Sequence, residues 1–438
     1  MVLIYSEEKS PRLEYIAGLI FENILKTGVA FTNDESEFRK SNNPKINYSQ
    51  RKFDDCPGLT PHEILFGKDV VYPVFETTLY EGEPYFFATS GNSFLPFDPF
   101  AASFFLVTRL EEYLEPARTK YNCYPAEKSI LTKYGLLKKP VVNIWARMLA
   151  GKIAERYPQF KIPDPVFKFI STIDVDNAWA YLNKGLIRSF GALVKDAITG
   201  RRANNVRRIH TWSHPEDDPY DNYQYIRSVF KGHEESVLIF FLLGDYRKYD
   251  KNISYRNKKF RQLISDLAAT YEVGIHPSYY SGGGRGQNNP GKEIKRLEDI
   301  TGEKVEKSRQ HFLRLFFPGT YRGLIRHEIT KDFTMGYAEQ TGFRAGTCTP
   351  YFFYDLETDM KTNLKIYPFQ VMDVTLKDYL GLNVAAAIDE IKLLMEEVRN
   401  VGGTFIGIWH NETLGNGGKG YREVFEFMNR TGFQWANE

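Results

Sequence analysis

Acidic and histidine side chains stand at the ends of several apolar runs, and they are the residues best suited to chemistry. Asp174 and Asp176 close the run FKFISTIDVD, and His276 follows EVGI. His311 lies at the end of EKSRQHF and His410 closes GTFIGIWH, so three of the eight histidines end such runs. In parallel α/β barrels, residues at the carboxyl ends of strands converge on one rim. An acid–histidine rim of this kind indicates a metal-dependent hydrolase.

The two aspartates of STIDVDN lie two residues apart and therefore share one face of a strand. Neighbouring carboxylates repel each other unless a cation or a shared proton relieves them, so one is expected to bind metal and the other to act as a base. The alternative is a solvated strand end where polar residues start a turn, a role that would suit Asn177. Because an apolar strand runs directly into Asp-x-Asp, the functional interpretation is favoured.

Arg309 and His410 could complete a catalytic group. Arg309 shares a strand face with His311 and can hold a carboxylate through a bidentate pair, or can be an ordinary ion-pair partner. His410 follows an apolar run, where a histidine can act as a general acid, although a buried structural histidine is an equal alternative. The same structural alternative applies to His276 taken alone. The remaining histidines fall in loops or helices and carry no predicted role: His62, His210, His214, His233 and His327.

From residue 167 onward, strand-like and helical segments alternate. Seven runs rich in β-branched and aromatic residues are expected as strands: 167–176, 236–243, 272–278, 306–312, 342–347, 365–373 and 403–410. Helical patterns lie between most of them, at 258–270, 292–300, 330–341 and 384–400. Such alternation predicts a parallel sheet, either closed as a barrel or open and doubly wound. The glycine-rich SGGGRG at 281–286 is expected to be a loop.

The first 160 residues have a separate mixed pattern. Short strands are expected at 2–6, 70–75 and 84–88, and helices at about 13–25, 99–113 and 142–156. The stretch 157–166 contains three prolines and marks a boundary. We therefore predict two domains, an α/β domain at 1–160 and a larger one at 161–438, which suits a chain of 438 residues.

Composition narrows the class of protein. The net charge of +2 encodes no strong attraction to nucleic acid or to an anionic membrane. Aromatic residues reach 15%, and such rings can stack on sugars, although most must fill the core. The three cysteines are far apart and indicate neither a disulfide framework nor a metal site. Because the start has only a four-residue apolar run and no run approaches about 18, we expect a cytoplasmic protein without membrane insertion.

The residues from about 167 to 438 resemble the polysaccharide deacetylase superfamily, also called the NodB-homology or carbohydrate esterase family 4 group. Asp174 and Asp176 resemble its first motif, in which the first aspartate is the base and the second binds metal. Arg309 resembles the arginine that orients the base. His410 resembles the general-acid histidine near the end of the last strand. The Asp-Trp motif of the family is not recognisable.

The second motif of the family is His-x-x-x-His, and both histidines bind metal. His276 matches the first position, but Tyr280 occupies the second. Two ligands hold Zn²⁺ poorly, so we predict that His311, at the same rim, joins Asp176 and His276 as the third ligand.

The resemblance implies a deformed (β/α)7 barrel behind an N-terminal α/β accessory domain. It also implies a divalent metal, with Zn²⁺ as the first choice, and hydrolysis of an N-acetyl amide on a sugar. In that reaction Asp174, held by Arg309, takes a proton from water, and His410 protonates the leaving amine. A cytoplasmic location favours a small or carrier-linked sugar. Two alternatives stay open: an amidohydrolase of a small non-sugar amide, and a sugar-binding pseudoenzyme without metal.

Overall fold

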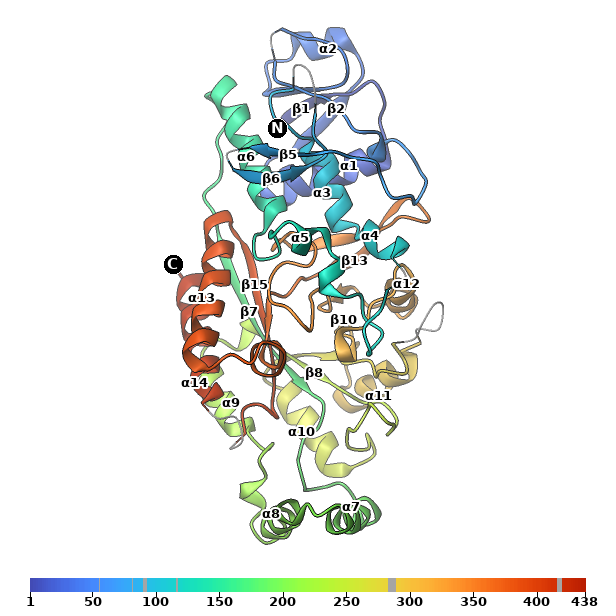
Figure 1. Ribbon diagram of the computed structural model, residues 1–438, viewed down its shortest axis with the longest axis vertical. Coiled ribbons are helices and arrows are strands. Elements are labelled where there is room, and N and C mark those ends of the chain that lie inside the picture. Colours follow the sequence, from blue (N-terminus) through green and yellow to red (C-terminus); the bar gives the residue numbers. More distant parts are fainter. Residues whose placement is uncertain (55, 81, 90–92, 116, 283–288, 416–419) are drawn as a thin grey trace.

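The computed structural model describes residues 1–438 apart from 55, 81, 90–92, 116, 283–288 and 416–419. Most of the expected loop at 281–286 therefore lies outside the described residues. The protein is a mixed α/β structure, as the sequence predicts, and it is elongated along one axis (Figure 1). The N-terminal sheet lies at one end of that axis, and the helices α7 (Leu186–Ile198) and α8 (Arg202–Ser213) lie at the other.

The larger sheet has nine strands among the described residues, in the order β12-β13-β11-β10-β9-β8-β7-β15-β14. Their bounds are β7 Phe167–Val175, β8 Val237–Phe241, β9 Glu272–Ile275, β10 Lys307–Ser308, β11 Lys331–Asp332, β12 Tyr351–Asp355, β13 Met360–Ile366, β14 Val371–Met372 and β15 Gly403–His410. All neighbours pair in parallel except β12 and β13, which are antiparallel. The parallel arrangement agrees with the strand–helix alternation of the sequence.

The sheet curves, because two strands close in the sequence pair near its opposite ends, and one of its faces carries a hydrophobic cluster. Leu238 and Phe240 of β8 pack in one cluster with Ile406 and Ile408 of β15, although Ile239 between them faces the other way. Within the segment 360–372, β13 pairs with β11 while β14 pairs with β15. This segment therefore lies against both halves of the curved sheet. Among the described residues, however, no ladder joins the edge strands β12 and β14, so the expected closed seven-stranded barrel is not observed as such.

Two expected elements of this region are wrong. The run 342–347 is not a strand, because Gly342 and Gly346 have φ angles of 122° and 66°, outside the extended range of a strand. The run 330–341 is not a helix, and its first residues form β11 instead. There the carboxylate of Asp332 accepts hydrogen bonds from the backbone N–H and the hydroxyl of Thr334, which favours a turn over a helix.

Amphipathic helices cover the outer face of the sheet: α9 (Tyr223–Phe230), α10 (Lys258–Ala268), α11 (Gly291–Thr301), α12 (Gly319–Arg326), α13 (Val384–Val401) and α14 (Tyr421–Ala436). The helices expected at 258–270, 292–300 and 384–400 are confirmed as α10, α11 and α13. α14 packs closely on β7, since a Cβ at Gly432 would lie 2.4 Å from the ring of Phe169. These helices fix β7 and β15, the two strands that carry the aspartates and His410.

The N-terminal part has a parallel sheet of four strands in the order β2-β1-β3-β4 and a separate hairpin of β5 and β6. The strands are β1 Val2–Tyr5, β2 Val29–Thr32, β3 Lys45–Tyr48, β4 Gly58–Leu59, β5 Thr77–Tyr80 and β6 Glu83–Phe86. The main helices are α1 (Pro11–Ala17), α2 (Glu35–Lys40), α3 (Pro99–Val107), α4 (Leu110–Leu114), α5 (Ile130–Lys133) and α6 (Val141–Arg156). The expected strand at 70–75 is wrong, and Pro73 within it cannot donate to a ladder.

The N-terminal part packs firmly on the larger sheet. One hydrophobic cluster runs from Val2 to Phe433 without a break between the two parts. Polar contacts cross the same boundary, including a buried one from Arg109 Nη1 to the carbonyl of Arg344 and a partly buried one from Tyr15 Oη to the carbonyl of Phe352. In the part of the chain that the structure describes, no helix is long and apolar enough to cross a membrane.

Candidate active site

Asp174 and Arg309 form a buried ion pair at the carboxyl end of the sheet. Asp174 lies near the end of β7, directly opposite His410 of β15 in the strand register. Arg309 follows β10, and its Nη1 lies 2.8 Å from Asp174 Oδ1 and 2.7 Å from Thr172 Oγ1. Its Nε donates to the carbonyl of Phe333 at 3.0 Å. Asp174 is 2% exposed and Arg309 is fully buried, so the guanidinium fixes the orientation of this carboxylate.

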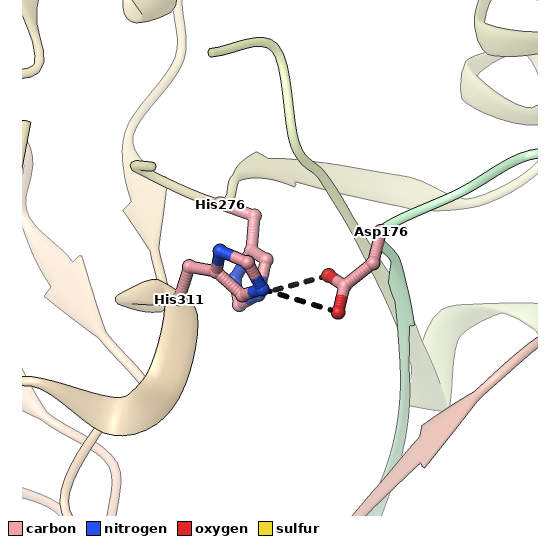
Figure 2. A group of neighbouring side chains, drawn as sticks. All are labelled: Asp176, His276 and His311. Carbon is pink, nitrogen blue, oxygen red and sulfur yellow. Dashed lines mark ion pairs between the residues drawn. The ribbon is translucent and has the colours of Figure 1, made fainter. Parts of the chain in front are cut away.

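Asp176, His276 and His311 form a group that could hold a metal ion (Figure 2). Asp176 follows β7, His276 follows β9 and His311 follows β10. One oxygen or nitrogen from each lies within 4.8 Å of the others. Asp176 Oδ1 is 3.3 Å from His276 Nε2, and its Oδ2 is 3.3 Å from His311 Nε2. The carboxylate therefore points between the two imidazole rings.

Each imidazole of this group has a hydrogen-bond partner at its Nδ1 atom. The Nδ1 of His276 lies 2.6 Å from the carbonyl oxygen of Arg309, and a carbonyl only accepts, so Nδ1 carries the proton. The Nδ1 of His311 lies 2.9 Å from Asp250 Oδ1. Such partners leave both Nε2 atoms as available ligands and orient the rings, as outer hydrogen bonds do in metal sites.

The charge balance of the group favours a cation. Burial alone lowers the pKa of His311, but Asp176 and Asp250 outweigh burial and raise it to about 9. Burial raises the pKa of Asp176, yet the two histidines hold it well below its ordinary value. The two carboxylates on either side of His311 therefore favour a positive charge between them.

His410 is held in the same way by a carboxylate that the sequence analysis missed. Its Nδ1 lies 2.8 Å from Asp373 Oδ1, and its backbone N–H donates to Asp373 Oδ2 at 2.9 Å. Burial lowers the pKa of His410, but Asp373 raises it more, to about 10. The Nε2 of this ring is 4.0 Å from Asp176 Oδ2, so a protonated His410 faces the group of Asp176, His276 and His311.

Tyr280, at the position of the second motif histidine, does not join this group. It is 41% exposed, and its ring lies under the guanidinium of Arg247 at 4.9 Å. His311 approaches Asp176 instead, from a different strand end. Of the two residues missed, Asp373 ends the expected run 365–373, so the same strand-end signal could have identified it. Asp250 lies in a loop after β8 and had no such signal.

These side chains meet at one cavity of about 220 Å³. Asp174, Asp176, His276, His311 and His410 all line it, and Arg309 lies behind Asp174. The other wall is largely aromatic and apolar, and the segment 119–124 of the N-terminal part contributes to it. The remaining lining residues are Thr119, Tyr121, Cys123, Tyr124, Gln310, Phe312, Leu313, Gly336, Tyr337, Ala338, Glu339, Arg344, Met372, Val374 and Tyr379.

Comparison with known proteins gives two kinds of similarity. Residues 2–158 match DUF7033, described as a family of unknown function. No curated protein sequence matches the chain at a significant level.

Similar solved structures include a protein assigned as a polysaccharide deacetylase from Mycobacterium smegmatis, with 17% identity and a TM-score of 0.40 over 62% of this chain and 86% of that chain. A polysaccharide deacetylase from Bacillus cereus has 12% identity and a TM-score of 0.30, over 61% and 87%. The Puue allantoinase has 12% identity and a TM-score of 0.37, over 61% and 84%. All three similarities are low, and the chemistry of the site itself must carry the assignment of function.

Proposed function

We propose that this chain is a metal-dependent hydrolase that removes N-acetyl groups from a sugar or carbohydrate precursor. The observation that carries the proposal is that three kinds of functional side chain, each with different neighbours, line one cavity. They are a carboxylate bound to a buried arginine, a carboxylate between two imidazoles, and a histidine bound to a carboxylate. Amide hydrolysis requires a base, a stabiliser of negative charge and an acid for the leaving amine, and these groups suit those roles.

Asp176, His276 and His311 would hold the ion, and Zn²⁺ suits one carboxylate and two imidazoles. The residues fit such an ion, because Asp176 Oδ1 is buried and accepts no hydrogen bond from the described residues. Both Nδ1 atoms are engaged elsewhere, which leaves the Nε2 atoms for an ion. When bound, a divalent ion polarises a substrate carbonyl and lowers the pKa of a water molecule.

Asp174 is the proposed general base. Its Oδ1 is held by Arg309, whereas its Oδ2 lies toward His276, 3.9 Å from Nε2. An ionised carboxylate in this position can accept the proton of the attacking water without changing its own orientation. Arg309 is a positioning residue, since it lies behind Asp174 and outside the cavity lining.

His410 is the proposed general acid. Asp373 fixes its ring and keeps it protonated, and its Nε2 faces the cavity from the strand beside Asp174. A proton from Nε2 can pass to the amine nitrogen as the amide bond breaks. The proposed base and acid then act from neighbouring strands, at positions that are partners in the strand register.

The wall of the cavity supports a sugar ring as the group that carries the amide. Tyr121, Phe312 and Tyr379 contribute rings to it, and aromatic faces pack on the apolar faces of sugars. A cavity of about 220 Å³ is small for a ligand pocket, which favours a precursor or a chain end over the middle of a polymer.

The proposal is tested with the full chain supplied with Zn²⁺ or stripped by a chelator. We expect acetate release from N-acetylated sugars only in the metal-loaded protein. Release of product from small ureide-like amides instead would assign the site to a non-sugar amidohydrolase. A chain that binds sugar but takes up no metal under metal-replete conditions would be a pseudoenzyme, and the proposal would be wrong.

A further inference from the structure

The helices inserted between β7 and β8 expose an unusual amount of apolar surface. On α7, Leu186 is 90% exposed, Phe190 69% and Ile198 80%, and Val194 is exposed between them. These residues are spaced by four, so they form one stripe along the helix. Large apolar side chains gathered on one exposed face mark an interaction surface rather than an ordinary solvent-facing one.

The second helix extends the same surface. On α8, Val206, Ile209 and Trp212 are exposed and spaced by three. The two helices pack as a hairpin, in which Arg208 Nη2 lies 2.8 Å from Asp196 Oδ2. Leu186, Phe190 and Trp212 also line one hollow between the helices, so the two stripes form a continuous apolar face.

Positive charge is concentrated on the same hairpin. Between 184 and 213 there are seven basic residues and one acidic residue: Lys184, Arg188, Lys195, Arg201, Arg202, Arg207 and Arg208 against Asp196. The whole chain has a net charge of only +2, so the rest of the molecule is net acidic. A hairpin with exposed apolar stripes and an excess of basic residues has the composition of an element that lies in a membrane interface.

The hairpin is hydrogen-bonded to the loop that contains Asp250, the partner of His311. Arg188 donates to the backbone carbonyls of Lys251 at 2.5 Å and Asn252 at 2.9 Å. These residues follow Asp250, the partner of His311. The hairpin also lies at the end of the long axis away from the N-terminal sheet, where a flat surface can reach it (Figure 1).

We propose that the α7–α8 hairpin binds the enzyme to the surface of an anionic lipid bilayer. Helices of 13 and 12 residues are shorter than the roughly 20 needed to span a bilayer, so the hairpin would lie on the surface. A second copy of the chain is a poor occupant, because two strongly basic hairpins repel each other. A nucleic acid would match the charge but not a face of leucine, valine and isoleucine.

The test is flotation of the full chain with vesicles of phosphatidylcholine alone or with roughly one third phosphatidylglycerol. We expect binding to the anionic vesicles and little binding to the neutral ones. Replacing Leu186, Phe190 and Ile198 together by Asn should weaken binding by about 100-fold, since each side chain loses its burial in the interface. Replacing Arg201, Arg202 and Arg207 by Gln should weaken it by at least roughly tenfold.

A matched control replaces Val74 and Leu79, which are 87% and 74% exposed outside the hairpin, by Asn. This variant should bind like the wild type, and the far-ultraviolet circular dichroism of every variant should match it. A wild type that stays unbound, or a triple Asn variant that binds normally, would overturn the proposal. Self-association without vesicles that the triple variant abolishes would assign the face to a second copy instead.

Discussion

Asp174 and Asp176 have the same functional group, and their neighbours give them different chemistry. Asp174 contacts a guanidinium that keeps its charge at any working pH, whereas Asp176 lies between two imidazoles whose Nε2 atoms could bind a metal together with it. A base must exchange its proton in every turnover, while a ligand must stay bound throughout. The two residues should therefore respond differently to the same substitution.

Asp174→Asn keeps the size of the side chain but cannot accept a proton from water. We expect this variant to retain its metal and to release acetate roughly 100-fold or more slowly than the wild type. Metal content and acetate release measured on the same sample separate the two effects. Asp217→Asn, at an exposed carboxylate, is the control and should behave as the wild type. Acetate release by Asp174→Asn at the wild-type rate would exclude this residue as the base.

His311→Ala removes the imidazole that we assign to the place of the missing motif histidine. We expect the affinity for Zn²⁺ to fall by more than roughly 100-fold. Loss of a hydrogen-bond partner that only orients a ligand typically costs roughly 10- to 100-fold. Asp250→Asn, which removes the charged hydrogen-bond partner of His311 but no ligand, should lower the affinity by roughly 10- to 100-fold. Competition with a chelating dye measures both, and His327→Ala outside the site is the control. Unchanged affinity in His311→Ala would remove this residue from the site.

At the scale of elements, strand ends were easier to predict than strand lengths. Asp174 and His410 could be assigned to one rim because long apolar runs, now β7 and β15, lead into them. β10 and β11 have two residues each, too few for a periodic pattern, so their extent could not be read from the sequence. The curvature of the sheet depends on the pairing of β13 with β11 and of β14 with β15, near opposite ends of the strand order, which no local pattern encodes.

The segment 119–124 gives the N-terminal part a role in the cavity. Tyr121 packs on Phe312 with ring centroids 4.8 Å apart, and both line the cavity. Tyr121→Ala should therefore raise the KM for a sugar substrate by roughly tenfold with a small change in kcat, because it removes binding surface and no reacting group. Tyr72→Ala, at an exposed tyrosine outside the cavity, should change neither constant. A fall in kcat at unchanged KM would contradict a role in binding.

At the scale of the whole molecule, the net charge does not show how charged residues are distributed along the chain. The net charge of +2 led to the expectation of no strong attraction to anionic membranes, and a net charge does not reveal that seven basic residues lie between 184 and 213. The two parts expected as separate domains also share one hydrophobic cluster and the buried ion pair between Glu112 and Arg344. Sequence patterning identifies each part, but the contacts between them involve residues far apart in the chain.

Glu112 joins the two parts through a buried network, and its removal should weaken the molecule as a whole. It accepts a hydrogen bond from Arg109 Nε at 2.8 Å and two from Arg344, at 2.9 and 2.5 Å, and all three side chains are about 1% exposed or less. Glu112→Gln leaves two buried guanidiniums without this counter-charge, so we expect a loss of about 3 kcal/mol in the free energy of unfolding. Urea unfolding measures this loss, and Glu155→Gln at an exposed pair should cost no more than about 1 kcal/mol.

The pH dependence of this loss gives a second measure of the same contact. Burial raises the pKa of Glu112, but Arg344 and Arg109 lower it more, so the folded-state pKa lies below the ordinary value of 4.5. A depressed carboxylate pKa stabilises the folded state above pH 4.5, and the stabilisation is lost as the pH falls through the folded-state value. The difference in stability between the wild type and Glu112→Gln should therefore be constant near neutral pH and shrink in acid. A difference that stays constant down to the acid transition would mean that Glu112 supports the fold by packing rather than by charge.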